Sequence, residues 1–305
     1  MKKDILTLKD LSVGEIETLI CRALSFKKGK KFGSLLKGKV LGLIFEKAST
    51  RTRVSFEVAM MRLGGQAIYL DCGATQIARG ETIADTAQVL SRYLDGIVMR
   101  TYAQARLEEM ASNASIPVIN GLTDLHHPVQ ILTDLMTIVE LKGSRRAANL
   151  KKCRISYVGD GNNMANSWIH AAMLLGFPLS LACPKGYWPD ANLLTAADGF
   201  KNIHLTEDPA EAVEGSGVVN TDTWFSMGQE VSDEKRRLFE PYQVNRSLMA
   251  QADRKAIVLH CLPAHRGEEI TDEVMDGPQS AVFDQAENRV WMQMAILEKL
   301  MGRKR

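Results

Sequence analysis

Cysteine is scarce in this sequence, and its arrangement excludes a disulfide scaffold. The five cysteines, Cys21, Cys72, Cys153, Cys183 and Cys261, are odd in number, scattered, and form no Cys-x-x-Cys pair. We therefore expect reduced thiols and a cytoplasmic protein. No stretch approaches the roughly 18 uninterrupted apolar residues of a membrane helix. The first residues do not lead into an apolar stretch, so no signal peptide is expected.

Long runs of one charge sign are also missing. The 38 Lys and Arg nearly balance the 36 Asp and Glu, which gives a formal net charge of +2. Nucleic-acid proteins usually concentrate basic residues on a stripe, so no nucleic-acid partner is expected. The Gly-x-x-x-x-Gly-Lys-Ser/Thr loop of many nucleotide-binding proteins is absent as well. A small anionic substrate stays possible, because a few focused arginines are enough to bind one.

Short apolar runs alternate with helical patterns along the 305 residues. This alternation predicts an α/β protein with parallel sheets covered by helices. A polar, basic stretch at 144–152 is the best candidate for a domain boundary. We therefore predict two doubly wound parallel-sheet α/β domains, at 1–142 and 150–285, with a C-terminal helix within 286–305. The predicted strands are 40–45, 67–70, 96–99, 117–119, 155–158, 178–183, 203–206, 217–220, 256–259 and 281–283. The predicted helices are 51–63, 82–94, 103–113, 129–142, 163–175, 190–200 and 286–301, preceded by one that the Ser12–Glu15 capping box begins.

The most informative motif is Ser-Thr-Arg-Thr-Arg at 49–53, directly after a predicted buried strand. Free N–H groups at a helix start favour anions, and the hydroxyl groups add donors. Two arginines in a first helical turn are unfavourable by about 0.3–1 kcal/mol each, because they lie at the positive end of the helix dipole. A bound dianion would make their positive charges favourable there. The alternative is an ordinary helix cap with surface arginines. The position after a strand favours an anion site.

Other polar motifs also follow predicted strands, and each has a plainer interpretation. Gly159–Asn163 has a first Gly-x-Gly but no third glycine, so it is a weak dinucleotide motif. Arg100 alone is more often a salt-bridge partner. The adjacent His126 and His127 cannot easily share one metal ion. A buried cysteine such as Cys261 is usually a packing residue. Asp222, between two threonines, suits a turn or a helix cap, and we predict no metal.

Taken together, the motifs resemble the aspartate/ornithine carbamoyltransferase family over nearly the whole chain and in the same order. The segments at 45–53 and 127–130 are shared with the aspartate branch, whereas those at 222–228 and 260–263 are typical of the ornithine branch. The matching segments are 45–53, 99–101, 127–130, 159–163, 222–228, 260–263 and 288–289.

The resemblance implies transfer of the carbamoyl group of carbamoyl phosphate to the δ-amine of L-ornithine. Direct attack through a tetrahedral intermediate would give L-citrulline and phosphate without a cofactor, in arginine biosynthesis. It also implies a C-terminal helix that packs back on the first domain, and a homotrimer or a multiple of trimers. The implied catalytic residues are Arg100, His127 and Cys261. The implied carbamoyl phosphate-binding residues are Ser49, Thr50, Arg51, Thr52, Gln76, Arg100, His127, Gln130, Cys261, Leu262 and Arg289. The implied ornithine-binding residues are Asn163, Asp222, Ser226 and Met227.

Each implied role agrees with the chemistry of the residue. Arginine presents planar donors that fit a phosphate, so Arg51 would grip it, whereas Arg53 would be structural. Arg100 and His127 would stabilise the oxyanion. Asp222 would pair with the α-ammonium of ornithine. Cys261 would orient or help deprotonate the δ-amine rather than form a covalent intermediate.

Other functions remain open at this point. Aspartate, putrescine or N-acetylornithine would make the chain a different carbamoyltransferase. Asp222 argues against the last two, because one is without an α-carboxylate and the other has a blocked α-amine. A nucleotide-binding dehydrogenase or a regulatory binding protein on the same α/β plan is a further alternative, which the fold alone does not exclude.

Overall fold

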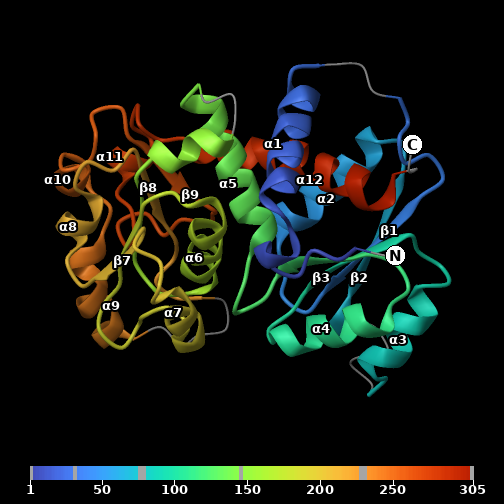
Figure 1. Cartoon of the computed structure of the whole chain (residues 1–305). Helices are drawn as coiled ribbons and strands as arrows, with labels where there is room; N and C mark the ends of the chain where they lie inside the picture. The colour runs from blue at the N-terminus through green and yellow to red at the C-terminus, as the bar shows by residue number, and fades with distance from the viewer. Residues whose placement is uncertain (1–2, 30–32, 75–79, 144–146, 227–231, 303–305) are drawn as a thin grey trace. The chain divides into compact units, whose positions relative to one another are not determined.

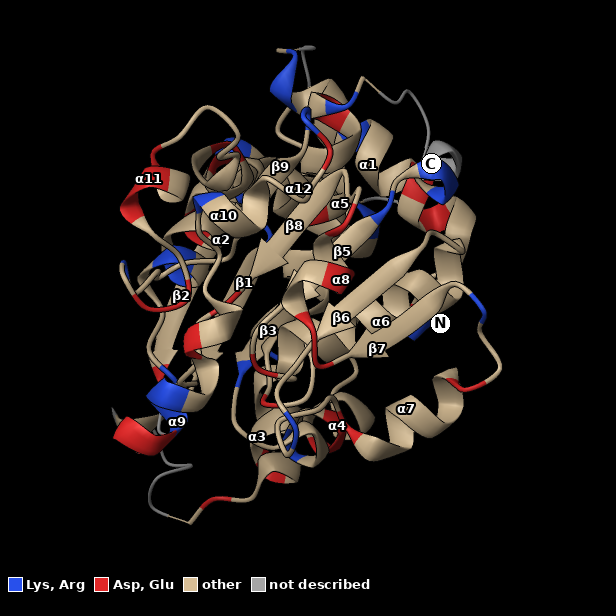
Figure 2. Ribbon diagram, turned by 90° about the vertical axis from the view of Figure 1, so that its left-hand side faces the viewer, with Lys and Arg blue, Asp and Glu red and all other residues tan. Residues whose placement is uncertain are grey.

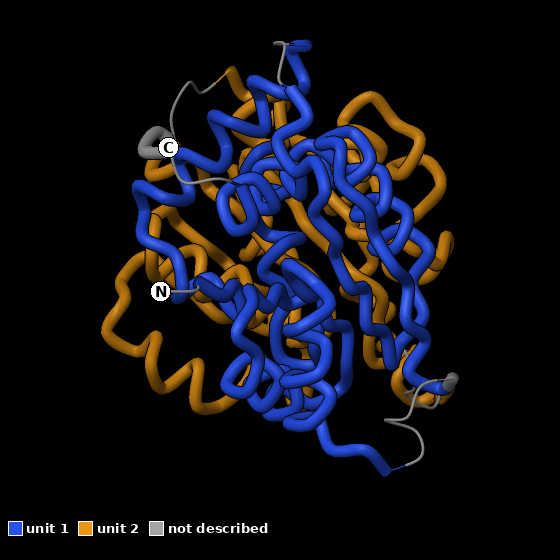
Figure 3. Tube along the Cα trace, turned by 90° about the vertical axis from the view of Figure 1, so that its right-hand side faces the viewer, with its two compact units in different colours: residues 1–136, 288–305 blue, residues 137–287 orange. Residues whose placement is uncertain are grey.

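The computed structural model describes residues 3–29, 33–74, 80–143, 147–226 and 232–302. The chain forms two compact units, which Figure 3 colours separately. Unit 1 comprises residues 1–136 and 288–305, and unit 2 comprises residues 137–287. The chain passes between the units inside α5 (Pro128–Leu141) and inside α12 (Val282–Met301). Acidic and basic residues are interspersed along the elements (Figure 2).

Unit 1 is built on a four-stranded parallel sheet with strand order β2-β1-β3-β4. Strand β3 is buried along its whole length, as expected for a parallel strand covered on both faces. The strands are β1 (Val40–Phe45), β2 (Gln66–Asp71), β3 (Gly96–Arg100) and β4 (Val118–Leu122). The helices besides α5 and α12 are η1 (Leu8–Asp10), α1 (Val13–Lys27), α2 (Thr50–Arg62), η2 (Cys72–Ala74), α3 (Ile83–Leu90) and α4 (Gln104–Asn113).

The strand order of unit 1 reverses direction at β1. The connection through α2 leads to β2 on one side of β1, and the connection through α3 leads to β3 on the other side. Right-handed crossovers then place α2 on one face of the sheet and α3 with α4 on the opposite face, as Figure 1 shows. Ligands of such sheets bind where the order reverses, beyond the carboxyl ends of the two strands. In unit 1 these are the ends of β1 and β3.

The C-terminal helix belongs to unit 1 from residue 288 onward, and it contacts α1. Arg22 donates two hydrogen bonds to Glu298, at 2.6 and 2.8 Å. Lys299 lies 2.9 Å from Glu15, the residue that completes the capping box with Ser12. The expected helix that packs back on the first domain, and the expected capping box, are both confirmed.

Unit 2 contains a five-stranded parallel sheet with strand order β7-β6-β5-β8-β9. Its order reverses at β5, so the ends of β5 and β8 flank the expected ligand position. The strands are β5 (Ile155–Val158), β6 (Leu179–Ala182), β7 (Ile203–Thr206), β8 (Val218–Thr221) and β9 (Ile257–His260). The helices are η4 (Ala147–Lys152), α6 (Asn163–Leu175), α7 (Ala191–Ala197), α8 (Pro209–Val213), α9 (Asp233–Phe239), η5 (Glu240–Tyr242), α10 (Arg246–Met249) and α11 (Asp272–Met275).

Each unit has an apolar core against its sheet. In unit 1 one face of the sheet packs on α3 and α4, with Ile97, Met99 and Leu107 fully buried. In unit 2 the core includes Val158 and Val219 of the sheet and extends to the short helices α8, α10 and α11. The predicted doubly wound α/β fold is therefore confirmed.

One predicted strand is wrong. Residues 281–283 were expected to form a strand, but α12 begins at Val282, and only a single bridge between Ser280 and Val258 precedes it. Ala281 and Val282 of that run are buried at the start of the helix, whereas Phe283 is exposed. A short apolar run does not distinguish such a helix start from a strand by itself. The short helices α8 to α11 were not predicted, because helices of four to seven residues leave little periodicity.

Candidate functional site

The Ser49–Arg53 motif begins α2 immediately beyond β1. Ser49 is the N-cap, and its side chain accepts a hydrogen bond from the Thr52 N–H at 3.3 Å. The first turn of α2 contains no acidic residue, unlike that of the capped helix α1. Nothing acidic in that turn offsets the positive end of the helix dipole. The start of α2 therefore has the geometry and the charge of an anion site.

The two arginines of the motif have different surroundings. Arg53 is exposed, donates to Glu57 at 3.0 Å, and stacks on the Tyr69 ring with its guanidinium 4.0 Å from the ring centroid. Arg51 is half-buried and makes no hydrogen bond or ion pair with any residue that the structure describes. The guanidinium of Arg51 is thus available to a ligand, whereas that of Arg53 already has protein partners.

Thr52 is joined to two other predicted site residues by Arg289. The Nη2 of Arg289 donates to the Thr52 Oγ1 at 3.0 Å, and its Nη1 donates to the Gln130 Oε1. Gln130 in turn donates to Asp134 at 2.8 Å. All four side chains are buried. Residues from α2, α5 and α12 therefore form one buried polar group at the start of α2.

Arg100 and His127 are buried in the same unit. Arg100 ends β3, where the pairing with β4 shifts register between Met99 and Arg100. Gly121 of β4 lies opposite, and a Cβ there would meet Val98 and the Met99 carbonyl at 3.0–3.1 Å. Such an irregularity turns a side chain away from its regular direction in the sheet. The periodicity of the sequence does not predict this register shift.

The imidazole of His127 is held in its neutral form. Burial lowers its pKa well below the usual value of 6.5, and the positive charges of Arg289 and Arg100 lower the pKa further. A neutral imidazole carries one N–H donor and one acceptor nitrogen. His127 can therefore donate a hydrogen bond to a carbonyl oxygen without adding a third positive charge to the two arginines.

In unit 2, Asp222 lies directly beyond β8 and is held on both carboxylate oxygens. The Asn162 amide donates to Oδ2 at 2.9 Å, and the Cys261 thiol donates to Oδ1 at 3.1 Å. Asn162 caps α6 and also contacts the buried Tyr157 hydroxyl at 3.2 Å. A carboxylate has about four acceptor positions, so Asp222 keeps acceptor capacity for a cationic ligand. The role of Asn162 was not predicted, although it lies beside the predicted Asn163.

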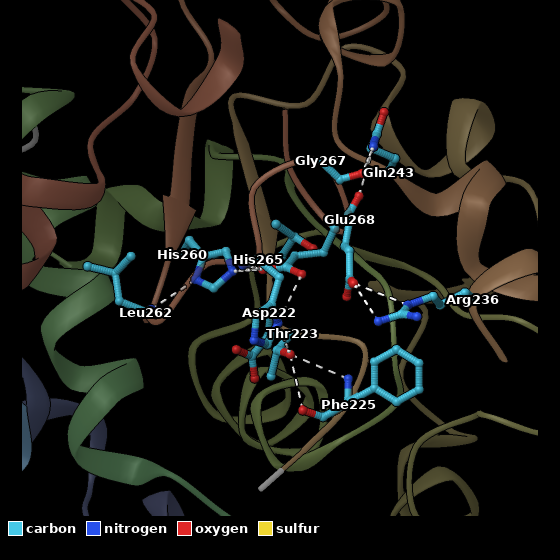
Figure 4. Close-up of polar contacts among 12 residues, drawn as sticks. Asp222, Thr223, Phe225, Arg236, Gln243, His260, Leu262, His265, Gly267 and Glu268 are labelled. Atoms are coloured by element: carbon cyan, nitrogen blue, oxygen red, sulfur yellow. Dashed lines mark hydrogen bonds and ion pairs between the residues drawn. The ribbon is translucent and has the colours of Figure 1, made fainter. Parts of the chain in front are cut away.

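The segment after β9 has an unusual backbone that depends on His260. Leu262 has a φ of +60°, and its N–H donates to the Nδ1 of His260 at 2.9 Å. Since Nδ1 accepts, the proton of a neutral His260 is on Nε2, which faces the buried Glu269 at 2.9 Å. Figure 4 shows His260 between Leu262 and the residues around His265. His260 and Glu269 thereby hold the turn that carries Cys261.

Two groups of side chains bring possible metal ligands within 4.8 Å of one another. Several of their donor atoms already have protein partners: Cys261 donates to Asp222, and both ring nitrogens of His260 are hydrogen-bonded. In the second group, Glu268 pairs with Arg236 and His265 contacts Thr223 (Figure 4). The groups are Asp222, His260 and Cys261, and His265, Glu268 and Glu269.

The remaining predicted residues are placed as follows. Ser226 is half-buried four residues beyond Asp222, and Asn163 is the first residue of α6. Thr50 is exposed in the first turn of α2. Gln76 and Met227 lie outside the described residues.

These arrangements are those of a group-transfer enzyme that takes an anionic donor in one α/β unit and a cationic acceptor in the other. Two family models match the chain. The aspartate/ornithine carbamoyltransferase carbamoyl-P binding domain matches residues 3–140, and the Asp/Orn binding domain of the same family matches residues 151–300. The chain belongs to the aspartate/ornithine carbamoyltransferase family.

Individual relatives resemble the chain over its full length. An ornithine carbamoyltransferase from Syntrophus aciditrophicus is 53% identical, with 99% of this chain and 100% of that protein covered. An anabolic ornithine carbamoyltransferase from Pyrococcus furiosus is 48% identical, over 98% and 96% of the two chains. The solved structure of an ornithine carbamoyltransferase from Pyrococcus furiosus superposes with a TM-score of 0.93 at 48% identity, covering 100% of this chain and 98% of that one.

Proposed function

We propose that this protein is an ornithine carbamoyltransferase that acts in arginine biosynthesis. It transfers the carbamoyl group of carbamoyl phosphate to the δ-amine of L-ornithine, giving L-citrulline and phosphate. The observation that carries the proposal is Asp222 held between Asn162 and Cys261, a buried carboxylate that matches the α-ammonium of an amino acid. The names of the relatives support the same substrates, and one of them is called anabolic.

Unit 1 supplies the donor site in this proposal. The backbone N–H groups and hydroxyls of Ser49, Thr50 and Thr52 bind the phosphate together with the Arg51 guanidinium. Gln76 is a further proposed contact with carbamoyl phosphate. Arg100 and neutral His127 donate to the carbonyl oxygen, where negative charge develops in the tetrahedral intermediate.

Gln130 is the proposed acceptor for the carbamoyl NH2 in the donor site. Its Oε1 already accepts a hydrogen bond from Arg289. An amide oxygen has two lone pairs, so the second one is the proposed acceptor for the carbamoyl NH2. Arg289 holds Gln130 and Thr52 while it borders the same site.

Unit 2 supplies the acceptor site. Asp222 pairs with the α-ammonium, and Asn163, Ser226 and Met227 contact the amino-acid substrate. Cys261 and the Leu262 backbone border the δ-amine and the carbamoyl group. In the reaction the nitrogen lone pair attacks the carbonyl carbon, the carbon–oxygen bond to phosphate breaks, and the proton of the amine leaves on the departing phosphate. The ornithine side-chain amine has a pKa near that of lysine, about 10.4, so the site must favour its neutral form.

We further propose domains at 1–142 and 150–285, a C-terminal helix within 286–305, and a homotrimer or a multiple of trimers in the cytoplasm. The odd number and scattered positions of the five cysteines support a reducing compartment. Among the described residues no helix is long and apolar enough to cross a membrane. Size-exclusion chromatography with light scattering tests the trimer, and a mass near that of one chain would contradict it.

The acceptor is tested by initial rates with L-ornithine, L-aspartate, putrescine and N-acetylornithine at saturating carbamoyl phosphate. We expect citrulline from ornithine at the highest kcat/KM. Preferred use of another acceptor would refute the assignment. Thermal unfolding separates the nucleotide-binding alternative, because carbamoyl phosphate should raise the melting temperature and NAD should leave it unchanged.

A further inference from the structure

A buried ion pair in unit 2 takes no part in the proposed chemistry. Lys235 of α9 and Asp160, which follows β5, have side chains that are only 8% and 10% exposed. The Lys235 Nζ donates to the Asp160 Oδ2 at 2.9 Å. Burying two opposite charges costs desolvation free energy that their attraction offsets only in good geometry. Such a pair is therefore weak as a source of stability, and its position in the fold becomes the informative feature.

Aromatic rings surround the ammonium group of Lys235. Its Nζ lies 4.6 Å from the ring centroid of Tyr187, 5.1 Å from that of Phe239 and 5.3 Å from that of Phe225. A cation near ring faces is attracted by their negative potential, most strongly when water is excluded. Tyr187 and Phe239 also contact each other edge to face at 5.0 Å. The ammonium group of Lys235 thus interacts with three other segments of the chain, those that contain Asp160, Tyr187 and Phe225.

Two of those segments carry the proposed acceptor-binding residues. Asp160 is two residues before Asn162, which donates to Asp222, and Phe225 is three residues after Asp222. Lys235 therefore links the turn beyond β5 to the segment beyond β8, the two strand ends that flank the reversal of the sheet order. Neither segment is held by strand pairing at these positions, because β5 ends at Val158 and β8 ends at Thr221.

The third segment, which contains Tyr187, also contacts the turn beyond β5. The Gly161 N–H donates to the Tyr187 carbonyl at 2.8 Å. A Cβ at Gly161 would come within 2.3 Å of the backbone of Trp188 and Pro189, so only glycine permits this approach. The turn is consequently held by two contacts, one with the 187–189 backbone and one with the Lys235 ammonium group.

Electrostatics also connects Lys235 with the acceptor site. Burial raises the pKa of Asp160, the positive charge of Lys235 lowers it, and the negative charge of Asp222 raises it. Asp160 and Asp222 therefore repel each other when both are ionised, and Lys235 compensates that repulsion. With Asp160 neutralised by Lys235, the net charge that remains for a cationic substrate is that of Asp222.

We propose that Lys235 is a positioning residue for the acceptor substrate, which fixes the Asn162 turn and the Asp222–Ser226 segment through Asp160 and Phe225. The inference rests on the proposed function of unit 2 as the ornithine site, and it assigns the role to the ion pair rather than to contact with ornithine. Loss of the pair shifts the groups that bind the amino-acid end of ornithine. A displacement of such groups by about 1 Å can lower the reaction rate by up to roughly 100-fold.

The test compares Lys235→Met, which keeps an unbranched apolar chain, with Asp160→Asn, which removes one charge at constant shape. Arg237→Met is the matched control, because Arg237 is exposed on the same helix. We expect each of the first two variants to raise the KM for ornithine about tenfold or more, with the KM for carbamoyl phosphate changed less than about twofold. The double variant should be no worse than the more impaired single variant, because neither charge is then left buried alone.

A merely structural role would lower the melting temperature and the yield of active enzyme at unchanged KM for ornithine, and that result overturns the proposal. If Lys235→Met does not fold, Asp160→Asn decides by the same KM comparison. Failure of the proposed function is recognised separately in the wild-type protein, as absence of citrulline or preference for another acceptor. In that case the KM for the preferred acceptor in the same variants decides the role of Lys235.

Discussion

Replacing Arg51 and Arg53 separately tests whether Arg51 binds the ligand while Arg53 makes only contacts within the protein. Arg51 is free of described protein partners, whereas Arg53 is committed to Glu57 and to the Tyr69 ring. Arg51→Ala therefore removes a ligand contact, and Arg53→Ala removes surface contacts. A hydrogen bond to a charged group contributes about 1.5–3 kcal/mol. This range corresponds to a rise of about 10- to 150-fold in the KM for carbamoyl phosphate for Arg51→Ala.

The contacts of Arg53 are worth less and affect a different quantity. An exposed ion pair four residues apart on a helix contributes about 0.3–0.5 kcal/mol, and an exposed cation–π contact about 0.5–1 kcal/mol. Arg53→Ala should therefore lower the free energy of unfolding by at most about 1.5 kcal/mol and leave the KM for carbamoyl phosphate nearly unchanged. Its side chain is 46% exposed, so salt and water screen the ion pair.

Initial rates are measured against carbamoyl phosphate at saturating ornithine, and denaturant unfolding gives the stability of each variant. Arg51→Lys is the informative third variant, since it keeps the charge but removes the planar pair of donors. A larger rise in the KM for carbamoyl phosphate for Arg53→Ala than for Arg51→Ala would refute the assignment of ligand binding to Arg51 and of a structural role to Arg53. Equal effects of Ala and Lys at position 51 would assign the binding to donor geometry rather than to charge.

Three further predictions concern Cys261, His127 and Thr52. Cys261→Ala should lower kcat with ornithine, and full kcat with an unshifted pH profile would exclude a role of the thiol in amine activation. Because the folded pKa of His127 lies well below 6.5, the unfolded state alone binds that proton on acidification. Stability should therefore fall below about pH 6.5 by up to about 1.4 kcal/mol per pH unit until the folded pKa is reached, and less in His127→Gln. Thr52→Val removes the hydroxyl that accepts from Arg289, and a KM for carbamoyl phosphate raised about 2- to 10-fold is expected; an unchanged KM would show that Arg289 needs no such support.

The sequence was most informative where local chemistry determines the structure. The Ser12–Glu15 capping box and the helix start at Ser49 depend on residues within one turn, and both are present. The buried strands were also found, because runs such as Val40–Phe45 are apolar on both faces. The Val282 helix start was missed because an apolar run of three residues suits either a strand or a buried turn.

Long-range relationships were beyond the sequence alone. The bond between Arg289 and Thr52 joins residues 237 positions apart, and no local pattern indicates which hydroxyl an arginine meets. Lys235 is a similar case, since in the sequence it is one of three neighbouring basic residues in a short helix. Its burial against Asp160 follows only from the packing of α9 on three other segments, those of Asp160, Tyr187 and Phe225.

The location of Asp222, Ser226 and Cys261 has a consequence for how such an enzyme can change during evolution. All three lie beyond the last residues of β8 and β9, on backbone that forms no part of the sheet ladder. Insertions, deletions and substitutions there leave the register of the strands intact, and loops tolerate them well. A lineage can therefore acquire a new amine acceptor by exchanging two short loops, while the strands beneath and the phosphate-binding start of α2 stay under separate selection.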